Sequence, residues 1–305
     1  MNRVVRVTSR RLAVVAALLA QPAAAQVKHE VSFEASAGIE FDDNITVTQI
    51  DAESEEEDFA ALLGAEADWS MEFGESDELD LGYSLDYSQQ FDITQFDLLT
   101  QGLSAAYRHE FESFSVGVSH NFFYSRLGGE SFLKLNRTSP SISGFATSKL
   151  FLRGAYIFQN KAFDNRTARD ADTHMGEASA FYFVDGADTF LSATYRFESE
   201  DAFADRFDFD ANIFKAGLHT RLPFAHDENR FVVSVEYEGR DYDAITPSIG
   251  AVRDDDRLTF DADWEVPLGD LFYALVEYRY RDFDSNFPSS DFTENVASLQ
   301  FGVRF

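Results

Sequence analysis

Charged side chains alternate with apolar ones along the last three hydrophobic segments of the chain, and they are the side chains best placed for chemistry. If these segments are β-strands, the charges of each fall on one face, because successive side chains point to opposite faces. We predict that this face lines the inside of a barrel and carries Arg257, Asp261, Asp263, Glu265, Glu277, Arg279, Arg281, Glu294 and Arg304.

Two interpretations of these charges stay open. Acid and base alternate across neighbouring segments, so the side chains could form a network of ion pairs that stiffens the wall, which is the interpretation the pattern favours. Alternatively, they could line a passage and select the ions or solutes that cross it, as rings of charged side chains do in channels.

A second set of charges lies in an acidic run that reads as a loop. It contains Glu53, Glu55, Glu56, Glu57 and Asp58, and a shorter run, Asp254-Asp255-Asp256, reads as another loop. Carboxylates of this kind could bind Ca²⁺ or Mg²⁺, which prefer oxygen ligands. No EF-hand spacing is present, so a solvated acidic surface is the preferred interpretation, and we assign no metal and no cofactor.

Catalytic chemistry has little support in the sequence. The six histidines show no spacing typical of a zinc site, and no G-x-S-x-G nucleophile motif is present. The chain has no cysteine, which excludes disulfides and thiolate ligands. Serine, histidine and aspartate are available, but a triad is defined by its geometry. We predict that the protein is not an enzyme.

The segments that must position these charges have the two-residue period of half-buried strands. In the last one Phe301, Val303 and Phe305 alternate with polar or small residues. A closing strand that ends on an aromatic residue resembles the assembly signal of outer-membrane β-barrels, so we expect the barrel assembly machinery to read these three side chains. The alternative is a terminal edge strand of a soluble β-sandwich.

About fourteen such segments follow one another, and they predict an all-β, closed antiparallel transmembrane barrel. Closure follows because lipid offers no hydrogen-bond partner to an open sheet edge. The sixth segment has Pro140 at its start, and the tenth changes phase between Ile213 and Phe214, which predicts a β-bulge. The segments are residues 31–41, 59–71, 79–87, 101–107, 114–122, 139–146, 150–158, 175–184, 191–197, 207–218, 231–237, 258–266, 272–280 and 297–305.

The connections between these segments alternate in length. We expect short turns after the even-numbered strands, such as Gly74-Glu75-Ser76-Asp77 and Pro267-Leu268-Gly269-Asp270, and longer polar loops after the odd-numbered ones. Short turns of outer-membrane barrels face the periplasm and long loops face outward. This pattern and an even strand number place both termini in the periplasm.

The first residues and the composition agree with that location. Residues 1–25 combine four arginines, a short apolar run and Ala23-Ala24-Ala25, which predicts a cleaved signal peptide before a barrel domain of residues 26–305. Cleavage leaves 21 basic against 54 acidic residues, a formal charge of −33. This excess of acid excludes nucleic acid as a partner, because phosphates attract Lys and Arg. Aromatic residues make up 15% of the chain, as a lipid-facing wall with aromatic girdles requires.

Four segments at the ends of strands resemble the barrel domain of the surface lipoprotein assembly modifier (Slam) group and related outer-membrane barrels. They are Gly-Ile-Glu-Phe-Asp-Asp-Asn-Ile at 38–45, Phe-Leu-Lys-Leu-Asn-Arg at 132–137, Arg-Asp-Asp-Asp-Arg at 253–257 and Arg-Asp-Phe-Asp-Ser-Asn at 281–286. The resemblance covers most of the chain after the signal peptide and implies a barrel of about fourteen strands. A related group of β-barrel porins shares the Asp42-Asp43-Asn44 pattern.

One departure from the Slam group concerns the partner. Slam proteins carry a periplasmic helical repeat domain before the barrel, whereas only residues 26–30 lie between the expected cleavage site and the first strand. If lipoprotein export is the activity, a separate periplasmic protein must supply that domain. We otherwise expect outer-membrane lipid and lipopolysaccharide as partners.

Two functions remain open from the sequence. The first is transport of a solute, polymer or exported protein through the barrel, which the strand number and the charged inner face favour. The second is a structural or adhesive barrel without an open pore, whose acidic loops contact cations, lipopolysaccharide or a partner.

Overall fold

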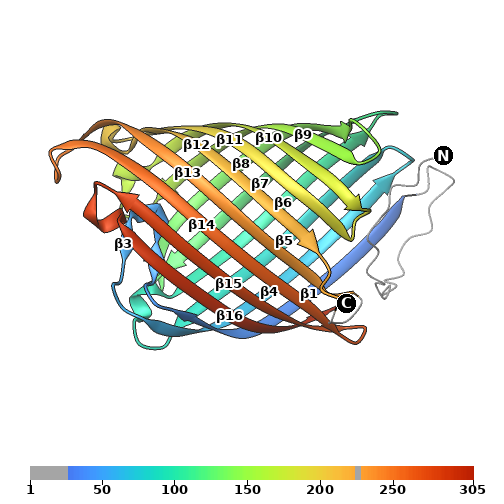
Figure 1. Ribbon diagram of the computed structural model, residues 1–305, viewed down its shortest axis with the longest axis horizontal. Helices are drawn as coiled ribbons and strands as arrows, with labels where there is room; N and C mark the ends of the chain where they lie inside the picture. Colours follow the sequence, from blue (N-terminus) through green and yellow to red (C-terminus); the bar gives the residue numbers. More distant parts are fainter. Residues whose placement is uncertain (1–26, 224–227) are drawn as a thin grey trace.

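The computed structural model describes residues 27–223 and 228–305, which form one closed antiparallel barrel of fourteen strands (Figure 1). The fold class predicted from the two-residue period is confirmed. The predicted signal peptide lies outside the described residues. The wall strands are β1 (Lys28–Asp42), β4 (Asp58–Phe73), β5 (Asp77–Gln90), β6 (Leu98–Glu110), β7 (Ser115–Leu127), β8 (Glu130–Phe145), β9 (Leu150–Phe163), β10 (Ala171–Asp185), β11 (Thr189–Ala202), β12 (Phe209–Thr220), β13 (Arg230–Thr246), β14 (Ala251–Leu268), β15 (Phe272–Ser285) and β16 (Phe292–Arg304).

Short elements lie at one end of the barrel, between wall strands. The first of them, the hairpin of β2 and β3 with the turn η1 between its strands, belongs to the connection of residues 43–57. Among the described residues no helix is long and apolar enough to cross a membrane. The short elements are β2 (Thr46–Val47), η1 (Thr48–Ile50), β3 (Ala52–Glu53), η2 (Thr94–Phe96), η3 (Thr167–Arg169), η4 (Asp205–Phe207) and η5 (Pro288–Ser290).

The barrel closes where β1 pairs with β16. Phe33 and Phe305 exchange two backbone hydrogen bonds of 3.1 and 2.9 Å, so the C-terminus and the start of β1 lie at the same end (Figure 1). We call this the turn end, and we call the opposite end, where residues 43–57 lie, the loop end. Every wall strand has two hydrogen-bonded neighbours, which leaves no open edge to meet lipid.

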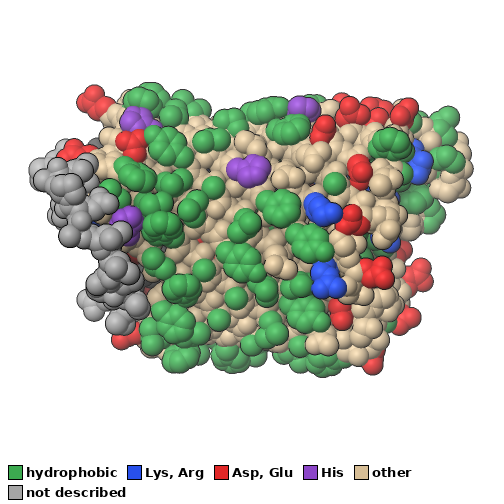
Figure 2. Space-filling model, turned by 180° about the vertical axis from the view of Figure 1, so that it is seen from behind, with side chains coloured by type: hydrophobic (Ala, Val, Ile, Leu, Met, Phe, Trp, Pro, Cys, Tyr) green, Lys and Arg blue, Asp and Glu red, His purple; other side chains and the backbone are tan. Residues whose placement is uncertain are grey.

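The outer wall is apolar along most of its length. Outward side chains at alternate positions are exposed, including Phe33, Leu63, Leu103 and Phe301 at 50–56%. A soluble barrel would have to hide such an apolar band from water. Figure 2 shows hydrophobic side chains across this wall, with Asp and Glu gathering toward the loop end. This is the pattern of a wall that faces lipid along its middle.

The strands continue past that apolar band at the loop end. β13 and β14 have 17 and 18 residues, whereas about 9–11 residues are enough to cross a bilayer at the usual tilt. The loop-end parts of β10 to β15 carry outward-facing, exposed aspartates that lie directly opposite one another on neighbouring strands. We call these aspartates the collar. The opposed pairs are Asp172 with Asp201, Asp210 with Asp241, Asp241 with Asp254, and Asp256 with Asp284.

The structure corrects three predictions about loops and turns. Asp254-Asp255-Asp256 lies within β14, not in a loop, and β7 and β8 are joined by Gly128 and Gly129 alone. Both glycines have positive φ angles, 56° and 81°, as a two-residue hairpin turn requires. The polar residues expected in long loops continue the hydrogen-bonded wall above the membrane, so the loop after the fifth predicted strand is short. Similarly, Pro267 and Leu268 belong to β14 and not to a turn.

Two strand predictions were also wrong. β8 begins at Glu130, so Pro140 lies inside the strand, on the outer face. The pairing of β8 with β9 runs to Thr138 and resumes at Ser141 in the same register, because proline has no N–H to donate. β12 contains no bulge, since both of its pairings run without a shift. Its phase change arises because Phe209, Ala211 and Ile213 are buried on the inner face, whereas apolar residues from Phe214 onward face outward.

Candidate functional site

The connection between β1 and β4 folds back across the mouth of the barrel at the loop end. Thr46, near its start, contacts Glu294 of β16, and Val47 packs with Phe132 of β8 and Phe163 of β9. β16 neighbours β1, whereas β8 and β9 lie about halfway around the barrel. Residues 43–57 therefore bridge opposite walls, and we call them the inserted loop.

Asp51 at the tip of the hairpin makes the strongest polar contact of the inserted loop. Its carboxylate accepts two hydrogen bonds from Arg253 at 2.9 Å each and one from Arg169 at 2.6 Å. The side chain is only 4% exposed, and that of Arg253 is 2% exposed. Two arginines at this distance give a charge-assisted, bidentate arrangement. Asp51 has a φ of 50°, a strained conformation for a residue other than glycine.

The ionisation of Asp51 follows from these neighbours. Burial alone would raise the pKa of its carboxyl group, but the hydrogen bonds from Arg253 and the charges of Arg253 and Arg169 outweigh burial. The pKa therefore lies well below its ordinary value. Asp51 stays ionised at any physiological pH, so the contact is a permanent feature of the resting barrel.

Hydrogen bonds of the residues that follow β1 direct the chain into the lumen. The Asp43 carboxylate accepts hydrogen bonds from the backbone N–H and the side chain of Asn295 at 2.7 and 2.8 Å. The Asn44 side chain donates to the carbonyl of Thr293 at 3.2 Å and to Glu53 at 3.3 Å. The Asp-Asp-Asn pattern noted in the sequence is thus a structural clamp at the base of the inserted loop.

An apolar contact fixes the far side of the loop. Val47 belongs to a buried cluster with Phe132, Leu133 and Phe163, and Ile50 packs against it. Phe132 and Leu133 are neighbours in the sequence, yet both are buried. The pairing of β7 with β8 shifts at this point, between Ser131 and Leu133. Such a bulge allows two consecutive residues to contact the same loop.

One wall of the lumen is acidic. β1, β4 and β5 are adjacent, and Lys28 is their only lysine or arginine. Carboxylates occupy the inward positions of these strands, with Glu34 directly opposite Glu66 in the register. The others are Glu30, Glu40, Asp42, Asp58, Asp68, Glu72, Glu78, Asp80 and Asp86.

The opposite wall carries charges of both signs. Glu177 of β10 accepts hydrogen bonds from Arg153 of β9 at 2.7 Å and from Arg196 of β11 at 2.8 Å, and Lys215 of β12 pairs with Glu236 at 3.6 Å. In the strand order β10 to β12 lie across the barrel from β1, β4 and β5. The charge of the lumen is therefore asymmetric, because one side carries almost only carboxylates and the other carries ion pairs.

Water reaches the charges in the middle of the lumen. The inward side chains of Arg153, Lys215 and Arg279 are 34%, 44% and 47% exposed. A lumen filled by side chains, as in the smallest barrels, would leave these groups buried. The barrel therefore holds an aqueous space below the inserted loop.

The structure places all nine predicted lining residues on the inner face. Arg279 pairs with Asp261 at 2.7 Å, Arg281 with Glu294, and Arg304 with both Glu34 and Glu265. Glu277 accepts hydrogen bonds from Ser298 and Gln300, and Asp263 lies beside Glu277 in the register of β14 and β15. Arg257 and Glu294 differ from the rest because they are buried against the inserted loop. Arg257 pairs with Asp255 at 2.7 Å, and Glu294 accepts a hydrogen bond from Thr46 at 2.6 Å.

The acidic residues predicted as a cation-binding loop do not converge. Asp58 accepts hydrogen bonds from the backbone N–H groups of Phe59, Asp92 and Ile93, so it fastens the connection after β5. Glu53 is held by Asn44, whereas Glu55, Glu56 and Glu57 are exposed. Within residues 27–223 and 228–305, no group of three or more Asp, Glu, His or Cys is arranged to hold a metal ion.

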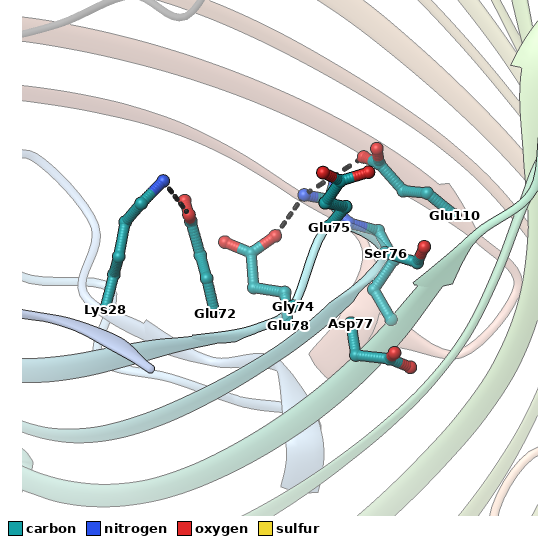
Figure 3. A pocket seen from close by; sticks show the side chains of 9 residues that line it. Lys28, Glu72, Gly74, Glu75, Ser76, Asp77, Glu78 and Glu110 are labelled. Carbon is teal, nitrogen blue, oxygen red and sulfur yellow. Dashed lines mark hydrogen bonds and ion pairs between the residues drawn. The ribbon is translucent and has the colours of Figure 1, made fainter. Parts of the chain in front are cut away.

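A hollow of about 260 Å³ lies at the turn end (Figure 3). Arg108 pairs there with Glu78 and, at 3.7 Å, with Glu110, and Lys28 pairs with Glu72 at 3.1 Å. Its lining contains five carboxylates and two basic groups, so this mouth is acidic. The lining residues are Lys28, Glu72, Gly74, Glu75, Ser76, Asp77, Glu78, Arg108 and Glu110.

The predicted assembly signal lies on the outer wall. Phe301 and Phe305 are 56% and 45% exposed, and Val303 shares their face of β16. Their recognition by the assembly machinery stays a prediction.

Sequence reasoning missed the inserted loop and a lumen patch of aromatic rings near the turn end. Ile45, Val47 and Ile50 are apolar residues in an otherwise acidic connection, and this was the available signal for burial.

In the aromatic patch of the lumen, the ring centres of Phe183 and Phe190 lie 5.5 Å apart, and Phe190 stacks on His219 at 4.2 Å. The patch was hidden because phenylalanine in a barrel strand was assigned to the lipid face.

Comparisons with known proteins identify the fold. No family model and no curated protein matches the chain. Among solved structures it is similar to the outer membrane channel DcaP of Acinetobacter baumannii, with a TM-score of 0.58 and 10% identity over 92% of this chain and 97% of that chain. It is similar to OmpT of Vibrio cholerae, with a TM-score of 0.54 and 11% identity over 93% and 99%. It also resembles an anion-selective porin from Comamonas acidovorans, with a TM-score of 0.51 and 8% identity over 92% and 100%.

These likenesses agree with the apolar outer wall and the polar lumen described above. At such identities they concern architecture alone. The chain has the fold of outer-membrane β-barrels such as porins and channels.

Proposed function

We propose that this barrel is a diffusion channel for small solutes, with the inserted loop narrowing its loop end. The observation that carries the proposal is the water-exposed charge in the middle of the lumen, where Arg153, Lys215 and Arg279 remain 34–47% exposed. A purely structural or adhesive barrel has no need of an aqueous interior. The carboxylates along β1, β4 and β5, opposite a wall of paired charges, further suggest that the field across the lumen orients the solutes that pass.

Single-channel recording in planar bilayers tests this proposal. We expect stepwise conductance, because water fills the lumen below the inserted loop. We also expect a preference for cations, since the wall of β1, β4 and β5 and the hollow at the turn end are acidic. Purified, folded protein that inserts into bilayers without current above background would contradict the channel and favour the structural alternative.

We further propose that the loop end faces the cell exterior and that both ends of the barrel chain face the periplasm. Five of the six connections at the turn end have three or four residues, as periplasmic turns do, and the sixth, between β12 and β13, has nine. The chain contains no cysteine, so single-cysteine variants can report the orientation. We expect Glu56→Cys to react with a membrane-impermeant maleimide on intact cells, and Glu75→Cys, in the turn after β4, to react only after permeabilisation. The reverse pattern would invert the barrel.

A further inference from the structure

A cavity of about 140 Å³ lies between the inserted loop and the wall of β9 to β14. It is distinct from the mid-lumen ion pairs, and neither the fold nor the proposed channel requires it. Six ionisable residues line it: Lys161, Arg169, Arg240 and Arg257, with Asp51 and Glu200. Four cations against two anions give this lining a formal charge of +2, and two of the cations, Arg240 and Arg257, also pair with Glu238 and Asp255 outside the lining.

Arg257 supplies a hydrogen-bond donor that nothing in the described residues satisfies. Its side chain is 7% exposed, and its Nη2 donates to Asp255 at 2.7 Å. Its Nε–H is buried and has no acceptor among the described residues. A buried donor of a charged group left unpaired is costly, and a ligand oxygen in the cavity that Arg257 lines would remove that cost.

The rest of the lining is aromatic. Arg169 lies over the ring of Phe207 at 4.1 Å and Arg240 over that of Phe209 at 4.0 Å. These cation–π contacts hold the guanidinium groups flat against the wall. Phe163 and Tyr242 complete the aromatic surface. The cavity therefore offers apolar contact beside positive charge.

The size of the cavity limits its occupant. An apolar protein cavity of about 150 Å³ accommodates benzene, so 140 Å³ has room for about one ring. We propose that the cavity binds a small organic anion, a carboxylate carried on a body no larger than a single ring. The proposal rests on the proposed function, because the solute reaches the cavity through the lumen or past the inserted loop.

Benzoate is the probe, and benzyl alcohol is the neutral control of nearly the same shape. Benzoate should interrupt the single-channel current in a concentration-dependent way and raise the unfolding temperature of the barrel in detergent, because a ligand of the folded state stabilises it. Benzyl alcohol should do neither at the same concentration. Equal effects of both compounds would overturn the proposal.

Variants separate this cavity from general electrostatics. Arg257→Gln should weaken benzoate binding at least tenfold, whereas Arg279→Gln, which removes an inward arginine outside the cavity, should change it less than twofold. Equal losses in both variants would contradict the site. If Arg257→Gln fails to fold, as judged by heat-modifiable mobility on gels, Lys161→Gln takes its place with the same expectation.

The two readouts also distinguish this inference from the channel itself. A barrel that conducts but shows neither current interruption nor a benzoate-dependent unfolding temperature has no such site, although the proposed function stands. A barrel that is stabilised by benzoate but carries no current has the site without the channel.

Discussion

Replacing Asp51 by alanine should release the inserted loop from the lumen and raise the conductance of the open barrel. The change leaves Arg253 and Arg169 buried without their shared carboxylate. Removing one partner of a buried ion pair costs about 3–5 kcal/mol, because the remaining charge is uncompensated. That amounts to roughly two to four powers of ten in the ratio of docked to undocked loop. Single-channel recordings should show a larger and noisier current than the wild type.

Arg126→Ala is a suitable control for this variant. Arg126 lies on β7, and within residues 27–223 and 228–305 its side chain donates only to the carbonyl of Gly129 in the following turn. It should leave the conductance unchanged. Acidification provides a second check on the wild type. The pKa of Asp51 is lowered in the docked state, so its stabilising contribution is complete above its ordinary pKa of about 3.9. That contribution is lost only as the pH falls through the lowered value. Release of the loop between pH 8 and pH 5 would contradict the role given to Asp51.

Neutralising the acidic wall should remove most of the preference for cations. The variant Glu66→Gln, Asp68→Asn, Asp86→Asn takes three negative charges from the inward faces of β4 and β5. Charges act on a passing ion over a Debye length of about 8 Å at physiological salt and about 30 Å at 0.01 M. The reversal potential under a salt gradient should therefore move toward zero, and the change should be larger in dilute salt.

The matched control removes three charges from the outside of the barrel. Asp241→Asn, Asp254→Asn, Asp256→Asn changes exposed collar residues of β13 and β14. It should leave the reversal potential near that of the wild type. If both triple variants shift it equally, the selectivity comes from the net charge of the protein and not from the lumen wall.

The sequence predicted the wall of this barrel well, because strand periodicity is a local property. The fourteen strands and the inward placement of Arg279 and Glu265 follow from alternation alone. The inserted loop was not predictable in the same way. Asp51 and Arg253 are 202 positions apart, and only the closure of the barrel brings them together. Arg257 was assigned to the lumen, but its burial depends on the loop above it.

The sequence-based predictions were wrong where one local sequence pattern was compatible with two structures. The phase change in β12 was interpreted as a bulge because phenylalanine was expected to face lipid, yet Phe209 belongs to a buried cluster with Tyr242 on the inner face. The run of three aspartates was interpreted as a loop because strands rarely carry it. In β14 alternate members face opposite sides, so Asp255 is buried with Arg253 while its neighbours form the collar.

The aspartate collar fixes how deeply the barrel sits in its membrane. Opposed carboxylates such as Asp241 and Asp254 repel each other and tolerate that arrangement only where water and counterions screen them. The hydrocarbon layer must therefore end below these carboxylates. The loop-end parts of the strands between β10 and β16 then form a rigid rim at the level of the lipid headgroups. If the barrel tilted or sank, these carboxylates would move toward the acyl chains and lose their hydration. The free-energy cost of this desolvation opposes both movements and keeps the mouth of the barrel at a constant height.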